Sequence, residues 1–191
     1  YDVTGTLKKT MTNWVESSVT TSTGTADFLP AVVTPAGNSG LATSFTYTSF
    51  LAVDSITNSN GGSAAALYDY TTGLPFWTRV PDGAVTYYSY SYYPNANTRT
   101  ATTNGRGQRT TLDGLGRTVK VETLEGSTVL SVVDTEYVVC ACSASGKVWR
   151  VSQPHAPNGA VSWTTYTYDA LGRTVAVTAP DGSTTTTVYQ G

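Results

Sequence analysis

Two cysteines and a single histidine are the residues of this chain best suited to bind a metal or to serve as nucleophile and base. Cys140 and Cys142 are two positions apart, and His155 follows in a proline-rich connection. The three could supply three zinc ligands, but structural zinc sites normally have four ligands in paired CxxC spacing. A general base needs a nucleophile or carboxylate beside it, and no such residue lies near His155 in sequence. We therefore expect His155 to be an exposed loop residue and the thiols to be buried or idle. We also expect the chain to have no catalytic residue, no metal and no cofactor.

Three aspartates precede a glycine by three or four positions, in the pairs Asp69–Gly73, Asp113–Gly116 and Asp169–Gly172. Asp at the first position and Gly at the fourth position are typical of a type I turn closed by a glycine bulge. Carboxylates that work as an acid–base pair need no constant offset from glycine. The spacing therefore predicts turn-capping aspartates rather than catalytic ones.

A basic residue follows the turn glycine in three places, at Arg117, Lys147 and Arg173. We expect each cation either to stack on a tyrosine of the adjacent strand or to bind a turn carbonyl. A row of such cations could instead bind anionic glycans, with tryptophan rings as stacking surfaces. The candidate carbohydrate contacts are Trp77, Trp149, Arg117 and Arg173.

The composition indicates that β-strands position these residues. The chain holds 36 Thr, 18 Ser and 13 Tyr among 191 residues, and β-branched and aromatic residues favour strands. Only 13% of the residues are charged, against roughly 25% in an ordinary globular domain. A net charge of −2 argues against nucleic-acid binding and anionic membranes. No apolar run approaches the roughly 20 residues of a membrane helix.

The sequence repeats itself. Residues 113–128 align with residues 169–184 at an offset of 56, with 10 identities in 16 positions, and residues 81–92 align with 157–168 at an offset of 76. The best copy predicts a DxxG turn, a strand over residues 173–179, a Pro-Asp-Gly turn and a return strand over residues 183–189. The repeat motif comprises Tyr68, Asp69, Gly73, Pro81, Gly83, Asp113, Gly116, Arg117, Gly126, Tyr168, Asp169, Gly172, Arg173, Pro180, Gly182 and Tyr189.

Hydroxyl side chains on both faces of the predicted strands, as in residues 98–103 and 183–187, indicate a thin sheet without a thick core. Tyrosine ladders between neighbouring strands would then supply the apolar contact. We expect these tyrosines to be structural, so that Tyr168→Ala lowers the melting temperature.

The repeats vary in quality along the chain. Residues 1–67 are degenerate repeats with Ser/Thr-rich loops, and residues 68–191 are recognisable repeats of the same continuous array. Residues 58–66 are expected to form a surface loop, and residues 143–147 (SASGK) to replace the DxxGR turn with a variant. Because both ends of the sequence fall within the array, we expect the chain to be an excerpt of a longer one.

The segment YDALGRTVAVTAPDG, followed by Tyr189, resembles the YD repeat of the RHS family, and the resemblance is strongest in the C-terminal 80 residues. It implies an all-β array of antiparallel hairpins forming a curved or spiralling sheet, a solenoid or shell segment. Such sheets form hollow shells in toxin-complex cocoons, polymorphic toxins and teneurins. In the family a self-cleaving aspartate site follows the repeats, and no segment of this chain resembles it.

The resemblance implies a non-catalytic structural segment of an exported bacterial protein, extracellular or at the cell surface. Its sheet would enclose or display an effector. The expected partners are neighbouring repeats or copies of the chain, an encapsulated toxin, or glycans. Two alternatives stay open: a filament or adhesin of stacked repeats with O-glycans, and a carbohydrate-binding module.

Overall fold

The computed structural model describes residues 10–12, 15–21, 29–35, 39–92, 97–140 and 143–190. These residues form β-strands and one short 3₁₀ helix, η1 (Ser39–Leu41). The chain divides into two compact units, residues 1–87 and residues 88–191. Among the described residues, no helix has the length and apolar character that a membrane span requires.

The first unit contains seven strands and the start of an eighth: β1 (Thr10–Thr12), β2 (Val15–Thr21), β3 (Pro30–Pro35), β4 (Thr43–Tyr47), β5 (Val53–Thr57), β6 (Ser63–Tyr68), β7 (Pro75–Arg79) and β8 (Val85–Ser91). The second unit contains β9 (Thr98–Thr103), β10 (Arg106–Leu112), β11 (Thr118–Glu125), β12 (Thr128–Cys140), β13 (Ser143–Ser152), β14 (Trp163–Tyr168), β15 (Thr174–Thr178) and β16 (Thr184–Thr186).

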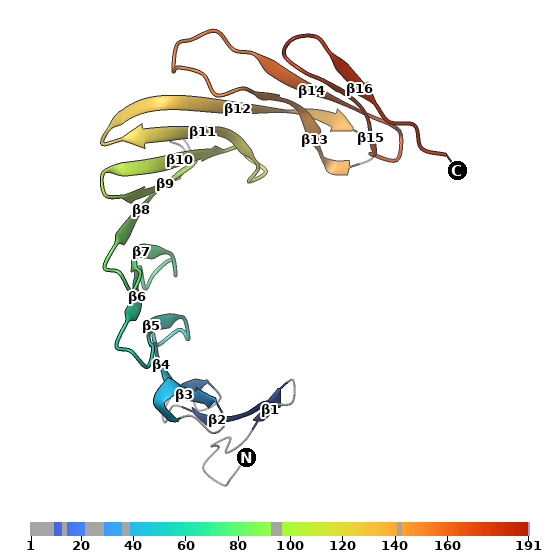
Figure 1. Cartoon of the computed structure of the whole chain (residues 1–191). Coiled ribbons are helices and arrows are strands. Elements are labelled where there is room, and N and C mark those ends of the chain that lie inside the picture. Colours follow the sequence, from blue (N-terminus) through green and yellow to red (C-terminus); the bar gives the residue numbers. More distant parts are fainter. Residues whose placement is uncertain are drawn as a thin grey trace. The chain divides into compact units, whose positions relative to one another are not determined.

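Within each unit the strands pair antiparallel with their sequence neighbours, so that the strand order in the sheet is the order in the chain (Figure 1). Tight turns join several of these strands, for example β5 to β6 and β14 to β15, and an antiparallel pair needs no longer connection. The predicted all-β array of antiparallel hairpins is confirmed.

The sheet has very little core. Among the described residues, the buried hydrophobic side chains are Leu124 and Val132, and the buried polar ones are Thr48, Thr110 and Ser152. No large side chain in this part of the chain is fully buried. Strand pairing and contacts between neighbouring strands therefore supply most of the stabilisation, as the hydroxyls on both faces predict.

Three expectations about local structure are corrected. The segment at residues 58–66 is not a long loop, because Asn58 and Gly62 close a tight turn and β6 begins at Ser63. Residues 143–147 form no turn of the DxxG type, because Ser143 pairs with Cys140 and the segment continues as part of β13. The return strand expected over residues 183–189 is shorter, since β16 ends at Thr186.

Candidate functional site

In the DxxGR turn, one aspartate side chain accepts hydrogen bonds from both the backbone and the arginine of the turn. In the turn between β10 and β11, one oxygen of Asp113 accepts hydrogen bonds from the backbone N–H groups of Leu115 and Arg117, both at 2.9 Å. The other oxygen accepts the Nε–H of Arg117 at 2.7 Å. Gly116 closes the turn with φ 77°, a left-handed conformation that costs glycine nothing. The turn between β14 and β15 repeats these contacts with Asp169, Leu171, Gly172 and Arg173 at 2.9, 2.9 and 2.7 Å.

The arginine of each turn reaches a tyrosine of the neighbouring strand or segment. The guanidinium of Arg117 lies 4.1 Å from the ring centre of Tyr137, and that of Arg173 lies 4.3 Å from the ring centre of Tyr189. The hydroxyl of Tyr137 donates to the carbonyl of Thr118 at 2.9 Å, one residue beyond the stacked arginine. The predicted arginine–tyrosine stacking is confirmed.

The same tyrosine hydroxyl bond between successive hairpins recurs at five places among the described residues. We call it the tyrosine lock. The five locks are Tyr47 to Pro30 (2.8 Å), Tyr68 to Val53 (3.1 Å), Tyr137 to Thr118 (2.9 Å), Tyr168 to Val148 (2.8 Å) and Tyr189 to Thr174 (3.1 Å), in each case hydroxyl to backbone carbonyl. Each lock ties a hairpin to the one before it.

Lys147 takes the arginine position of its repeat even though the DxxG turn is missing there. Its amine lies 5.8 Å from the ring centre of Tyr168, which locks to the adjacent Val148 carbonyl. Burial raises the pKa of the Tyr168 hydroxyl, with a smaller contribution from Tyr166. The contact between the strands is therefore present even where the sequence SASGK replaces the DxxGR motif.

A complete turn without any of the motif residues lies between β4 and β5. Thr48 N–H donates to the Ala52 carbonyl at 2.9 Å and Leu51 N–H donates to the Thr48 carbonyl at 3.0 Å. The Thr48 hydroxyl accepts the Ala52 N–H at 3.1 Å, as the aspartate does elsewhere. Leu51 has φ 68°, in the position that glycine holds elsewhere. The sequence motifs did not predict this turn. The available signal was Tyr47, which lies twenty-one positions before the repeat tyrosine Tyr68.

The remaining motif residues also lie in turns. Asp69 accepts the N–H groups of Thr71 and Thr72 in a turn one residue longer, closed by Gly73. The segments Pro81–Gly83 and Pro180–Gly182 form matching tight turns, in which Gly83 donates to Val80 and Gly182 donates to Ala179. Gly126 lies in the short turn between β11 and β12 and has φ 60°.

The hydrogen bonds in these turns depress carboxyl pKa values. The Arg117 side chain, and then its backbone N–H, lower the pKa of Asp113 below the ordinary range. The backbone N–H of Arg173 is the main cause of the lowered pKa of Asp169. The carboxylates are therefore held in the charged, hydrogen-bond-accepting form that the turn requires.

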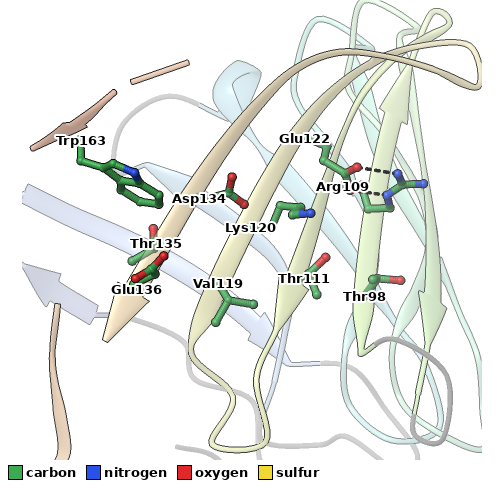
Figure 2. Close-up of a pocket in the computed structure, with 10 residues that line it drawn as sticks. All are labelled: Thr98, Arg109, Thr111, Val119, Lys120, Glu122, Asp134, Thr135, Glu136 and Trp163. Carbon is green, nitrogen blue, oxygen red and sulfur yellow. Dashed lines mark hydrogen bonds and ion pairs between the residues drawn. The ribbon is translucent and has the colours of Figure 1, made fainter. Parts of the chain in front are cut away.

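The second unit also carries a groove of about 820 Å³ on one face of its sheet (Figure 2). Its lining comprises Thr98, Arg109, Thr111, Val119, Lys120, Glu122, Asp134, Thr135, Glu136 and Trp163. Register explains the row across its floor, because Thr98 pairs with Thr111, Thr111 with Lys120, and Lys120 with Asp134 on four successive strands. Side chains in register on neighbouring strands share one face of a sheet.

Paired charges dominate the groove. Arg109 donates to both oxygens of Glu122 at 2.6 and 2.8 Å, and Arg150 donates to both oxygens of Glu136 at 2.9 Å. The Arg109 side chain lowers the pKa of Glu122, and Glu122 in turn raises the pKa of Arg109. The Arg150 guanidinium also lies 4.3 Å from the ring centre of Trp149 and 4.2 Å from that of Trp163.

His155 does not behave as an exposed loop residue. Its side chain is 9% exposed, and its Nε2 lies 3.0 Å from a carboxylate oxygen of Asp134. Its Nδ1 lies 2.8 Å from the Ala156 carbonyl, and its backbone exchanges hydrogen bonds with Val132. The expectation failed because Asp134 is 21 positions away in sequence and only strand pairing brings it close. The contact fastens residues 153–162 beside β12.

The other candidate residues fall into three groups. Cys142 and the side chain of Cys140 lie outside the described residues, and no cluster of three or more His, Cys, Asp or Glu suited to a metal occurs within them. Arg117 and Arg173, named as carbohydrate contacts, are engaged by their own turn aspartates and neighbouring tyrosines. Trp149 is 41% exposed beside Arg150, and Trp77 is half-buried on β7. Sugar binding by these four residues stays a prediction.

Residues 143–184 match the model of the RHS Repeat family. The match covers the part of the chain that contains the lysine variant, the second DxxGR turn and the last Pro-Asp-Gly turn. The resemblance to RHS and YD repeats inferred from the sequence is confirmed there. No curated protein matches the chain in sequence.

Solved structures of toxin complexes share the fold. A crystal structure of TcdB2–TccC3–TEV matches with TM-score 0.55 and 18% identity over 86% of this chain. The Tc holotoxin pore of Photorhabdus luminescens matches with TM-score 0.54 and 18% identity over 86% of this chain. A crystal structure of TcdB2–TccC3 matches with TM-score 0.51 and 12% identity over 97% of this chain. This chain spans only 8% of the first two chains and 14% of the third.

Proposed function

We propose that this chain is a non-catalytic wall segment of an exported bacterial RHS protein, and that its sheet encloses or displays an effector. The tyrosine lock carries the proposal, because at five places it joins a hairpin to its predecessor and so extends a sheet without needing a thick core. A single-layer sheet of this kind can form a wall between an enclosed space and the solvent.

Three further observations support a structural role. The carboxylates and guanidiniums of the motif form ion pairs within their own turns, Asp113 with Arg117 and Asp169 with Arg173. These contacts support a structural role for them. The matched family and the Tc toxin complexes of similar fold add the expectation of a shell around a toxin component. From the likeness to the RHS Repeat family and the Tc toxin complexes we also infer export and an extracellular or cell-surface location.

Cryo-electron microscopy of the natural full-length gene product tests the proposal. We expect closed hollow particles whose wall contains this sheet, and an internal polypeptide that resists protease until the particle is opened. Continuous fibres would instead favour the filament or adhesin alternative. Solid particles with no protected internal segment would contradict a shell.

A further inference from the structure

We propose that His155 is a proton-dependent clasp, which holds residues 153–162 against the edge of β12 in mild acid and releases them as the pH rises. The inference rests on the contacts of one imidazole ring and does not depend on whether the sheet encloses an effector. Backbone pairing between β12 and β13 ends at Thr135 and Val151. Further along β12, Val132 pairs instead with His155, so residues 153–162 cover the strand edge beyond the end of that pairing.

The ring of His155 has an oxygen acceptor at each of its nitrogens. Nε2 lies 3.0 Å from a carboxylate oxygen of Asp134, and Nδ1 lies 2.8 Å from the carbonyl oxygen of Ala156. A carbonyl oxygen and an ionised carboxylate only accept hydrogen bonds, so both ring nitrogens must donate. A neutral imidazole carries one N–H group and the protonated ring carries two. The geometry therefore belongs to a protonated ring.

Removal of that proton costs one of the two contacts, whichever nitrogen loses it. The lone pair then faces either the Asp134 carboxylate or the Ala156 carbonyl. A proton placed on Asp134 instead of the ring gives the same total, because the closed contact still holds one proton more than a neutral ring beside an ionised carboxylate. The closed form thus binds more protons than the open form, and linkage makes it less stable as the pH rises.

The contact lies where water is largely excluded. The His155 side chain is 9% exposed, and Val132, its backbone partner, is buried. Ser152 is also buried, and its hydroxyl accepts the backbone N–H of Asp134 at 2.8 Å. Hydrogen bonds with a charged partner are stronger in such surroundings, and an acceptor that faces a lone pair there is costly. Loss of the proton therefore favours release of the segment.

The other charged groups around the clasp ordinarily keep their charges between about pH 5.5 and 7.5, because arginine, lysine and glutamate titrate outside this range. They are Glu122 bonded to Arg109, Glu136 bonded to Arg150, and Lys120, which stands opposite Asp134 in the register (Figure 2). Histidine is the side chain whose charge ordinarily changes within the range. His155 is the only histidine of the chain, so a pH response there can be assigned to one ring.

Release of the segment would uncover a strand edge. The backbone N–H and carbonyl groups of Val132 both bond to His155 and would lose these partners. The buried Val132 side chain would become accessible at the same time. Unpaired strand edges are templates for pairing with another chain. The clasp therefore protects this edge of β12, and the protection is strongest in mild acid.

Hydrogen exchange of the intact chain, followed by NMR from about pH 5.5 to 7.5, tests the clasp. The amides of Val132 and His155 donate to each other's carbonyls and so report whether the segment is closed. After correction for the chemical exchange rate at each pH, we expect their protection to fall at least about threefold over this range. The fall should not exceed about tenfold per pH unit, because one proton is involved. Amides paired between β14 and β15 should keep constant protection.

Asp134→Asn is the matched variant. Its amide can donate to Nε2 of a neutral ring whose Nδ1–H keeps the bond to Ala156, so one neutral tautomer satisfies both contacts. Protection of the Val132 and His155 amides should then no longer depend on pH. His155→Gln removes the titrating group and should also abolish the pH dependence at Val132, with circular dichroism confirming that both variants fold.

Constant protection of these two amides in the parent chain would overturn the inference. A fall as steep in Asp134→Asn as in the parent chain would overturn it equally. An equal fall in β14 and β15 would show a loss of stability throughout the unit, and would contradict a local clasp.

Discussion

At the scale of single residues, tyrosine hydroxyls join consecutive hairpins. The lock from Tyr168 to the Val148 carbonyl spans 20 positions of sequence and is partly buried. A hydrogen bond of this kind contributes about 1 kcal/mol net, and an unsatisfied partner costs more when it is shielded from water.

We expect Tyr168→Phe to lower the melting temperature of the chain. The ring and its contact with Lys147 remain, so the loss is the hydroxyl bond, about 1 kcal/mol or roughly 2–4 °C for a chain of this size. Thermal unfolding followed by circular dichroism measures it. Tyr70→Phe is the control, since Tyr70 is 68% exposed and its hydroxyl makes no hydrogen bond to another described residue. An equal loss in both variants would contradict a specific lock.

A second residue-scale prediction compares two glycines of one turn. Gly116 has φ 77°, whereas Gly114 has no positive φ, and an added methyl group would meet nothing within 4 Å at either position. Gly116→Ala should therefore destabilise the chain by about 1–2 kcal/mol through backbone strain alone. Gly114→Ala should be neutral or slightly stabilising. Equal effects in urea unfolding would show that backbone conformation is not the cause.

At the scale of the element, each DxxGR turn combines a carboxylate, a closing glycine and a guanidinium that reaches the next tyrosine. A bulge precedes the DxxGR turn after Tyr168 and also the variant turns after Tyr47 and Tyr68. The register shifts immediately before these tyrosines, which then stand opposite Thr174, Val53 and Pro75. The bulge increases local twist and aims the side chain along the sheet. Tertiary register thus decides where the tyrosine points.

The turn aspartates predict a loss of stability in acid. The pKa values of Asp113 and Asp169 are lowered in the folded chain because their charged forms accept these hydrogen bonds. Their stabilising contribution is therefore complete above the unfolded-state pKa of about 3.9 and is lost as pH falls through the lower folded-state pKa.

Melting temperatures measured from pH 6 down to roughly pH 2 test this prediction. The double variant Asp113→Asn, Asp169→Asn should be less stable than the parent chain at pH 6. Its acid dependence should be shallower, because it lacks the two titrating groups. A decline in acid as steep as that of the parent chain would assign the acid sensitivity to other carboxylates.

At the scale of the whole molecule, the contacts are local in sequence. Among the described residues, the strands in contact are neighbours in the chain, and each unit has its own set. Arrays with contacts only between neighbours unfold as a sum of local units rather than as one block. Stability should therefore vary along the chain.

Hydrogen exchange tests this locality. We expect Tyr168→Ala to increase amide exchange in β13 to β15 and to leave exchange in β5 to β7 unchanged. The lost contact joins only β13 and β14 directly. A uniform increase across both units would indicate a single cooperative block and would contradict the picture of independent neighbours.

Much of the fold was predictable from the sequence because its turns are local. Asp-x-x-Gly and Pro-Asp-Gly specify φ angles and hydrogen bonds within four or five residues, so reading along the chain suffices. Strand period and Thr/Val/Tyr content likewise act over short distances. The order of strands in each unit follows, since successive hairpins have only their neighbours to pair with.

The all-β array of hairpins and the turn role of the aspartates could therefore be predicted, because short-range sterics and hydrogen bonds decide both. Which partners meet across strands could not be predicted in the same way, because it depends on strand register. The turn at Thr48–Ala52 lacks Asp, Gly and Arg, yet hydrogen bonds among its own residues close it with Leu51 at φ 68°. The contact of His155 with Asp134, and the groove that ends at Trp163, depend on strand register, and one bulge reverses which face a side chain occupies.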